Sequence, residues 1–285
     1  MRVFSRRLLA AIIALDAAVL AVVILYWVWV PDVSHLKSEN LKTTAYIEQF
    51  VRRSRRLGKR PLVMMRWRPL EAFSPHLRHA VIIAEDDMFY RHGGVDWDAV
   101  RQALRYDWER GKVLRGGSTI TQQLARNLYL SPARTPGRKL RETLIAWELE
   151  RKLSKDRILE LYLNIAEWGV GIYGAQAASE IYFGKSASDL TPEEAVSLAS
   201  ALPSPWRLNP LSGAGPRLDR RKEVLLGRMR RAGYLPPEIG EEEVELSAEI
   251  DIPSSTGGKK TPPLPAAPLP DEGAPLEITE NEPGR

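Results

Sequence analysis

Residues 85–94 (EDDMFYRHGG) place three acidic side chains in a row and end in two glycines. The preceding segment predicts a helix, because Ser74-Pro75 supplies an N-cap and a proline at the first helical position. Apolar residues then recur at helical spacing, at Leu77, Ala80, Val81 and Ala84. A helix C-terminus repels negative charge, and a carboxyl there in a partly buried cleft would have a raised pKa and suit a general base. A solvated acidic helix end explains the stretch equally well when it is taken alone.

A second polar stretch follows at residues 116–127 (GGSTITQQLARN). Two glycines before Ser118 and Thr119 can present backbone N–H groups at a helix start, where anionic or sugar oxygens bind. Gln122 and Gln123 add amide donors. A loop followed by a capped helix explains the same residues.

The third stretch gathers the cations Arg134, Arg138, Lys139 and Arg141 around Glu142. Thr135-Pro136 predicts a helix start. On that helix, Arg138, Arg141 and Glu142 share one face. The apolar stripe is expected on another face, at Leu140, Leu144 and Trp147. Guanidinium groups can grip a diphosphate, although a salt-bridged helix surface is the simpler interpretation of this stretch.

Further helix signals make the fold class mainly α. Ser154 is a candidate cap, with Ile158, Leu161 and Tyr162 facing inward. Thr191-Pro192 opens another helix, and residues 98–112 indicate an amphipathic one. We expect the catalytic domain at residues 61–240 and a juxtamembrane segment at 31–60. Residues 253–285 hold eight of the chain's 21 prolines and no aromatic residue, so 241–285 is predicted to be an acidic, then proline-rich disordered tail.

Residues 1–30 are predicted to hold a cytoplasmic N-terminus and one transmembrane helix. The apolar run 8–30 is interrupted only by Asp16, and its length suits a bilayer. Arg2, Arg6 and Arg7 precede it and favour a cytoplasmic N-terminus. A cleaved signal peptide is the alternative, disfavoured by the length of the run. Asp16 is interpreted as tolerated polarity or as a contact with a partner's helix.

The chain is basic overall, with a formal net charge of +5 and no cysteine. The absence of cysteine excludes disulfides and thiolate metal sites. Basic residues cluster at Arg52, Arg53, Arg55, Arg56, Lys59 and Arg60. A solvated helix face or contact with anionic head groups is favoured there, and nucleic acid is a poor candidate for a chain oriented outward.

The three stretches, in this order, resemble the peptidoglycan glycosyltransferases of glycosyltransferase family 51. The first family motif matches at Glu85, Asp86, Phe89, His92 and Gly94, and the second at residues 116–123. The third matches at Arg138, Lys139 and Glu142, and the fourth at residues 158–164. Residues 164–169, 171–174 and 182–183 look most like the monofunctional biosynthetic branch. Two positions depart from the pattern, since Arg126 stands where lysine is frequent and Met88 where arginine is common.

The resemblance implies a lysozyme-like glycosyltransferase fold and the polymerisation of lipid II, an undecaprenyl-diphosphate-linked disaccharide pentapeptide. The acceptor 4-hydroxyl would attack the anomeric carbon with inversion, forming a β-1,4 link and releasing undecaprenyl diphosphate. Glu85 would be the general base, and Glu142 would assist the leaving diphosphate, directly or through a divalent cation such as Mg or Mn. The implied substrate-binding residues are Ser118, Thr119, Gln122, Gln123, Arg126, Arg134, Arg138 and Lys139. His92 is expected to be structural.

The predicted anchor and its flanking arginines, taken with the resemblance, imply a single-pass protein of the cytoplasmic (inner) membrane, with the catalytic domain on the periplasmic side. Expected partners are lipid II, the growing lipid-linked glycan and membrane lipids, with other cell-wall synthesis or division proteins as further candidates. No transpeptidase activity is expected, because the Ser-x-x-Lys match at residues 34–37 stands without a supporting domain. The rival functions are a glycan hydrolase, which also uses paired carboxylates, and a non-enzymatic scaffold.

Overall fold

The computed structural model describes residues 12–20, 22, 24, 28–110, 117–131, 135–211 and 215–236. The predicted tail 241–285 and the candidate site residue Arg134 lie outside these residues, as does much of the predicted anchor. The side chains of Leu104 and Trp108 lie outside the description as well.

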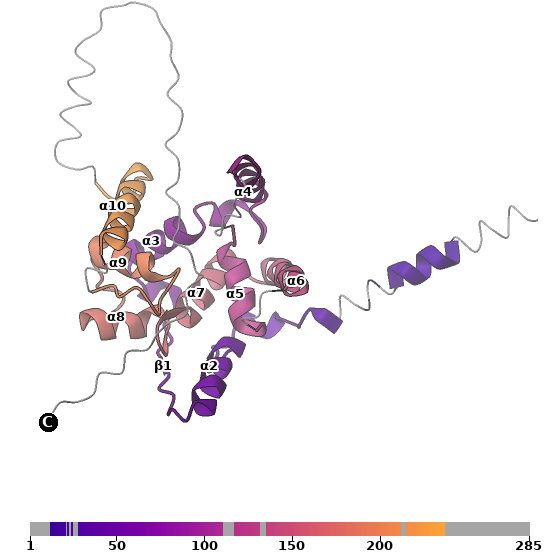
Figure 1. Cartoon of the computed structure of the whole chain (residues 1–285), viewed down its shortest axis with the longest axis horizontal. Helices are drawn as coiled ribbons and strands as arrows, with labels where there is room; N and C mark the ends of the chain where they lie inside the picture. Colours follow the sequence, from indigo (N-terminus) through magenta and orange to yellow (C-terminus); the bar gives the residue numbers. More distant parts are fainter. Residues whose placement is uncertain are drawn as a thin grey trace, which may run out of the picture.

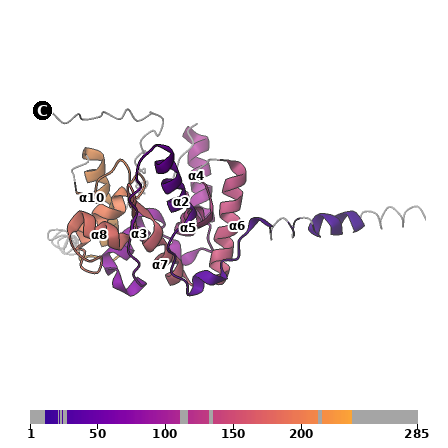
Figure 2. The same cartoon turned by 90° about the horizontal axis from the view of Figure 1, so that it is seen from below.

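The described domain is mainly helical and is organised around one central helix, α5 (Figures 1 and 2). α5 packs against α2, α6 and α7, while α3 packs against α9 and α10 beside them. The helices are α2 (Ala45–Arg56), α3 (Pro75–Glu85), α4 (Trp97–Arg110), α5 (Ile120–Tyr129), α6 (Pro136–Lys152), α7 (Lys155–Ile165), α8 (Ala175–Phe183), α9 (Pro192–Ala201) and α10 (Pro216–Arg231), with 3-10 turns at η1 (Ser34–Lys37), η2 (Leu70–Ala72) and η3 (Phe89–Arg91). The predicted mainly α class is confirmed.

The helix starts that the sequence predicts are confirmed. Ser74, Thr135, Ser154 and Thr191 are the N-caps of α3, α6, α7 and α9, and each side-chain oxygen accepts a backbone N–H of the first turn. A first-turn N–H has no carbonyl partner within the helix, so a side-chain acceptor next to it favours a helix start at that position.

A small sheet, which the sequence did not indicate, closes one side of the bundle. It has the order β1-β3-β2, from β1 (Met64–Met65), β2 (Glu167–Gly169) and β3 (Ile172–Tyr173). β1 pairs with β3 in parallel and β2 pairs with β3 antiparallel. Strands of two or three residues are too short to show the alternating pattern by which strands are recognised.

The predicted apolar stripe of α6 is wrong for Leu140 and Trp147, whereas Leu144 is partly buried and packs against the core. Leu140 and Trp147 are 55% and 43% exposed, and the buried face instead carries Glu142, Ile145, Ala146 and Leu149. This face follows the helical repeat, but its first position is a carboxylate. Two cations pair with the buried Glu142, as described below. The hydrophobic pattern predicted an exposed position for this residue because it takes no account of such pairing.

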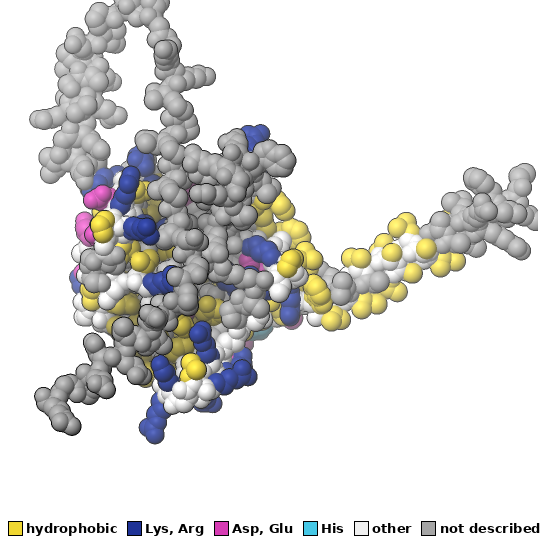
Figure 3. All heavy atoms as spheres, in the orientation of Figure 1, with side chains coloured by type: hydrophobic (Ala, Val, Ile, Leu, Met, Phe, Trp, Pro, Cys, Tyr) yellow, Lys and Arg dark blue, Asp and Glu magenta, His cyan; other side chains and the backbone are white. Residues whose placement is uncertain are grey.

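The N-terminal segment joins the domain through its last residues. Val30, Val33 and Leu36 are buried in the core, and the Arg141 Nε donates to the Trp29 carbonyl at 2.9 Å. Residues 12–20 are helical, and apolar side chains are exposed along the projecting segment (Figure 3). Among the described residues, no helix combines the length and the apolar character needed to cross a bilayer.

Gly174 holds β3 against the end of α7 and gives a test of this packing. It has φ 82°, and a Cβ there would lie 2.5 Å from the Asn164 carbonyl oxygen. Gly174→Ala is therefore expected to lower the free energy of unfolding by about 2–4 kcal/mol, measured by urea denaturation.

Gly184 is the matched control, because it has φ 68° and a Cβ added to it would meet nothing within 4 Å. Gly184→Ala carries only the conformational cost, about 1 kcal/mol. Equal losses in the two variants would contradict the close packing of Gly174 on Asn164.

Candidate active site

The first turn of α5 is the point where the predicted motifs meet. Thr119 and Gln122 form a capping box: the Gln122 N–H donates to Thr119 Oγ1 at 3.1 Å, and the Thr119 N–H donates to Gln122 Oε1 at 3.3 Å. The Thr119 hydroxyl also donates to the Gly94 carbonyl at 2.6 Å. The capped helix, which was the simpler interpretation of this stretch, is therefore present. Both side chains are buried and bonded within the protein.

Asp86 ties the end of α3 to this turn. Its Oδ2 accepts the Ile120 N–H at 2.9 Å, and its Oδ1 lies 2.8 Å from His92 Nε2. The Gly94 N–H donates to His92 Nδ1 at 3.2 Å, so the ring proton is on Nε2 and points at Asp86. The expected structural role of His92 agrees with these contacts. The Ile120 N–H, which could have met a ligand oxygen, is taken by Asp86.

Glu85, the last residue of α3, is held beside the same turn. Gln123 Nε2 donates to its Oε2 at 2.9 Å, while Oε1 is buried without a hydrogen bond among the described residues. Burial raises the pKa of the Glu85 carboxyl, and the Gln123 hydrogen bond and the charges of Arg221 and Arg126 only partly oppose this rise. A buried carboxyl with one unbonded oxygen and a raised pKa is suited to accept a proton.

Tyr162 of α7 sets the orientation of the Gln123 amide. Its hydroxyl donates to Gln123 Oε1 at 3.1 Å, which leaves the Nε2 side of the amide facing Glu85. Tyr162 is nearly fully buried, and burial raises its pKa well above the ordinary value, so it remains a donor at neutral pH. The sequence indicated Tyr162 only as an inward-facing residue, because its partner lies on another helix.

Glu142 is buried on α6 between two cations. Arg138 Nη1 lies 2.7 Å from its Oε2 and Lys139 Nζ lies 2.6 Å from its Oε1. The Glu142 side chain is 1% exposed, whereas that of Lys139 is 46% exposed. Lys139 Nζ also donates to Ser118 Oγ at 2.9 Å. The carboxylate thus holds two cations in place, and one of them remains open to solvent.

A continuous series of contacts joins the two candidate glutamates. From Glu85 it runs through Gln123, whose Nε2 lies 3.5 Å from the Ser118 carbonyl, and then through Ser118 and Lys139 to Glu142. Both carboxyls therefore lie at the N-terminal turn of α5, reached from α3 on one side and from α6 on the other.

A cleft of about 140 Å³ opens beside Glu85. Ser118 and Gly117 line it together with Asp96 and with Arg228 of α10. The sequence did not indicate the contribution of α10. Arg221 Nη2 lies 3.7 Å from Glu85 Oε1, and Arg228 Nη2 lies 2.8 Å from Asp87 Oδ2. A basic helix far along the chain gives no local sign that it returns to an acidic motif.

The remaining candidates lie as follows. Arg126 is half-buried on α5 and acts on Glu85 through its charge. Arg141 does not join the Glu142 cluster, because its Nε is bonded to Trp29. Met88 is exposed.

Arg221 offers a test of the electrostatics around Glu85. Because its positive charge favours the ionised carboxyl, Arg221→Gln is expected to raise the pKa of Glu85 further. The measurement is the ¹³C carboxyl titration of Glu85 by NMR, assigned with Glu85→Gln.

Arg220→Gln is the control, because Arg220 is its exposed neighbour on α10 and carries the same charge. A Glu85 pKa that moves equally in both variants, or in neither, would contradict the contact with Arg221.

Comparison with known proteins shows the family of the chain. The family model described as Transglycosylase matches residues 56–230, more than half of the chain. Three similar relatives are all named biosynthetic peptidoglycan transglycosylase. The protein of Nitrosospira multiformis is 40% identical over 75% of this chain and 93% of its own length. The protein of an Azoarcus species is 42% identical over 77% of this chain and 94% of its own length. The protein of Alcanivorax borkumensis is 46% identical over 71% of this chain and 78% of its own length.

The matched residues include both glutamates, the capped turn of α5 between them and the part of α10 that carries Arg221. With a family match over most of the folded domain and relatives at 40–46% identity, the chain belongs to the transglycosylase family and is a peptidoglycan glycosyltransferase.

Proposed function

We propose that this glycosyltransferase polymerises lipid II into β-1,4-linked glycan strands, with inversion at the anomeric carbon and release of undecaprenyl diphosphate. The observation that carries the proposal is the pairing of a buried Glu85, whose pKa is raised, with a cation cluster around Glu142 at one helix terminus. A glycosyl transfer of this kind needs a base for the attacking hydroxyl and positive charge for the departing diphosphate.

Glu85 is the proposed general base. Its unbonded Oε1 is the position from which a carboxylate would take the proton of the acceptor 4-hydroxyl. The charges of Arg221 and Arg126 favour the ionised Glu85 carboxylate, while burial raises its pKa and so makes it a stronger base. The net effect is a carboxyl at the end of α3 whose pKa lies above that of a solvated glutamate, as a general base requires.

Glu142 acts, in this proposal, through the cations that it holds. Fixing Arg138 and Lys139 before the substrate arrives avoids reorganisation when negative charge develops on the leaving diphosphate. Lys139, the more exposed of the two, would contact the phosphate oxygens. Arg126 and Arg134 are further candidates for this role.

The donor set around Glu142 does not fit a resident divalent cation. Both carboxylate oxygens are already ion-paired, and within the described residues no three His, Cys, Asp or Glu side chains gather as metal ligands. The positive charge at this place comes from the Arg138 and Lys139 side chains, and these carry the proposed stabilisation of the leaving group.

The four predicted substrate-binding residues of this turn have two different roles: one would contact the substrate, and three hold the turn and Glu85 in place. They are Ser118, Thr119, Gln122 and Gln123. Ser118 lines the cleft and reaches Lys139, so it is the best placed of the four to meet the substrate. Thr119 and Gln122 shape the turn, and Gln123 orients Glu85. We propose that the sugar path runs over this turn.

The membrane placement of the enzyme is part of the proposal. Residues 1–30 would form a single-pass anchor with its N-terminus in the cytoplasm, residues 61–240 the periplasmic catalytic domain, and 241–285 an unfolded tail. The exposed Leu140, Trp147 and Trp97 would face the head-group region, where the lipid of the substrate stays anchored. The proposed enzyme has no transpeptidase activity, and its partners would be lipid II, membrane lipids and other cell-wall synthesis proteins.

Glu85→Gln tests the catalytic assignment. The amide cannot accept the hydroxyl proton, so polymerisation of lipid II by the detergent-solubilised chain is expected to fall by about 10²–10⁴-fold. Because the folded-state pKa of Glu85 is raised, its ionisation above the unfolded-state pKa opposes folding. The variant is therefore expected to keep or slightly raise the melting temperature at neutral pH.

Glu71→Gln is the control, since Glu71 is an exposed glutamate outside the cleft. Glycan products should be resolved by size. Full polymerisation by Glu85→Gln would refute the role of this base, and shortening of preformed glycan by the unmodified enzyme would point to hydrolysis instead.

A further inference from the structure

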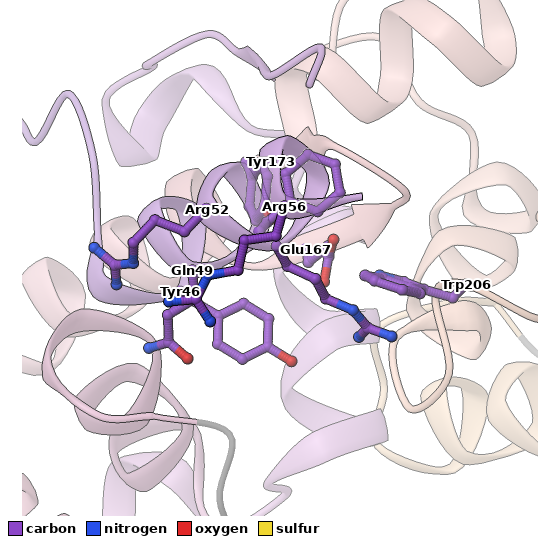
Figure 4. A pocket seen from close by; sticks show the side chains of 9 residues that line it. Tyr46, Gln49, Arg52, Arg56, Glu167, Tyr173 and Trp206 are labelled. Atoms are coloured by element: carbon purple, nitrogen blue, oxygen red, sulfur yellow. The ribbon is translucent and has the colours of Figure 1, made fainter. Parts of the chain in front are cut away.

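A second cavity, of about 360 Å³, is lined by residues other than those around Glu85 (Figure 4). It opens between α2, the β2–β3 hairpin and the segment after α9. None of its lining residues belongs to the catalytic cleft. They are Tyr46, Gln49, Phe50, Arg52, Arg53, Arg56, Glu167, Tyr173 and Trp206. Its volume is that of a site for a small ligand.

Three arginines of α2 form one wall of this second cavity. Arg52, Arg53 and Arg56 are exposed, and the lysine and arginine side chains over α2 form a basic surface in Figure 3. Arg53 lies over the Trp206 ring at 5.8 Å from its centroid, and Arg52 pairs with Glu48 on the solvent side at 3.2 Å. Guanidinium groups in such a wall suit carboxylates, which they can hold with two parallel hydrogen bonds.

The opposite wall carries a buried carboxyl. Glu167 is 9% exposed, and its Oε1 makes no hydrogen bond among the described residues. Burial raises the pKa of Glu167, and the nearby Trp206, Tyr173 and Gly171 partly oppose this rise. In Figure 4 its carboxyl points into the cavity between the arginines and Trp206. Its Oε1 is therefore a buried carboxyl oxygen to which a ligand could still supply a cation or a donor.

The two walls make the second cavity bipolar. A purely anionic ligand would suit the arginines but would bring like charge towards Glu167. A purely cationic ligand would suit Glu167 but would be repelled by the arginines. A ligand that carries both charges a few ångströms apart satisfies both walls.

The second cavity lies within reach of the catalytic cleft. Gln49 Nε2 donates to the Leu130 carbonyl at 3.1 Å, which places α2 at the C-terminal end of α5, while Glu85 lies near its N-terminal turn. The ten residues of α5 rise by ~15 Å, and five residues of extended peptide span at most ~17 Å. The length of an extended five-residue peptide is therefore comparable to the length of α5, at whose two ends the cleft and α2 lie.

We infer that the second cavity binds a zwitterionic peptide, with carboxylates on Arg53 and Arg56 and an ammonium group against Glu167. The peptide would be the stem carried by the lipid-linked disaccharide. This part of the inference rests on the function proposed above. The cavity would then select units that carry an intact peptide and would steady the strand while the next sugar is joined.

The binding test uses the full chain in detergent and a free pentapeptide with a carboxyl terminus, a glutamate and one lysine. A second peptide is identical but has its lysine acetylated. Glu167→Gln is expected to raise the Kd of the free-amine peptide by about tenfold and to leave the Kd of the acetylated peptide unchanged. Arg56→Gln should weaken the binding of both peptides. Arg55 is a neighbouring exposed arginine outside the cavity, and Arg55→Gln should weaken the binding of neither.

Equal binding of the two peptides, or no effect of Glu167→Gln on either, would overturn the inference. Melting temperatures separate loss of binding from loss of folding, and Glu167→Gln should not lower the melting temperature because it removes a buried carboxyl whose pKa is raised.

Polymerisation of lipid-linked disaccharide with and without its peptide supplies the second readout. Glu167→Gln should lower kcat/KM for the peptide-bearing substrate only. If the wild-type chain polymerises neither substrate, the proposed function fails, but the binding test still shows whether the second cavity binds the peptide. If Glu167→Gln leaves kcat/KM for the peptide-bearing substrate at the wild-type value, the cavity proposal fails and the function stands.

Discussion

The arrangement of the site depends on one buried carboxylate, Asp86. Its two oxygens accept from the first helical N–H of α5 and from His92, so the end of α3 and the start of α5 are held together at hydrogen-bond distance. Glu85 precedes Asp86 in the chain, and Gln123 lies one turn into α5. Fixing the junction therefore fixes the pairing of the proposed base with the amide that orients it. A helix N-terminus is an electropositive place, which also makes it a favourable place to bury an acid.

Three acids near this junction are buried in different ways. Asp86 is bonded through both oxygens, and Glu142 is ion-paired through both. In Glu85, Oε2 is hydrogen-bonded, while Oε1 has no hydrogen bond and lies 3.7 Å from Arg221 Nη2. Burial of an acid costs least where every lone pair has a partner, so the incomplete satisfaction of Glu85 is the costly feature, and it coincides with the proposed proton-accepting oxygen. The fold supplies the stability that keeps this group in place.

The sequence predicted the local features well. The caps at Ser74, Thr135, Ser154 and Thr191 are set by residues within one helical turn, and short-range chemistry is enough to find them. The burial of Glu142 was not predictable from periodicity, because it depends on Arg138 and Lys139 closing over the carboxylate. Three further residues could not be found from local sequence, because each contacts a partner more than 30 residues away. Tyr162 contacts Gln123, Arg221 contacts Glu85, and Glu167 lines a cavity with α2. The motifs of the resemblance lead to the cleft beside Glu85, but they did not indicate the second cavity.

The most direct test of this account is amide hydrogen exchange at Ile120. The first N–H of a helix normally lacks a partner and exchanges quickly, so slow exchange there reports the bond to Asp86 specifically. We predict that the Ile120 amide is protected as strongly as the middle of α5 and that Asp86→Ala removes this protection at the first turn. Fast exchange at Ile120 in the unmodified chain would show that Asp86 does not hold the two helices together, and the positioning of Glu85 would lose its basis.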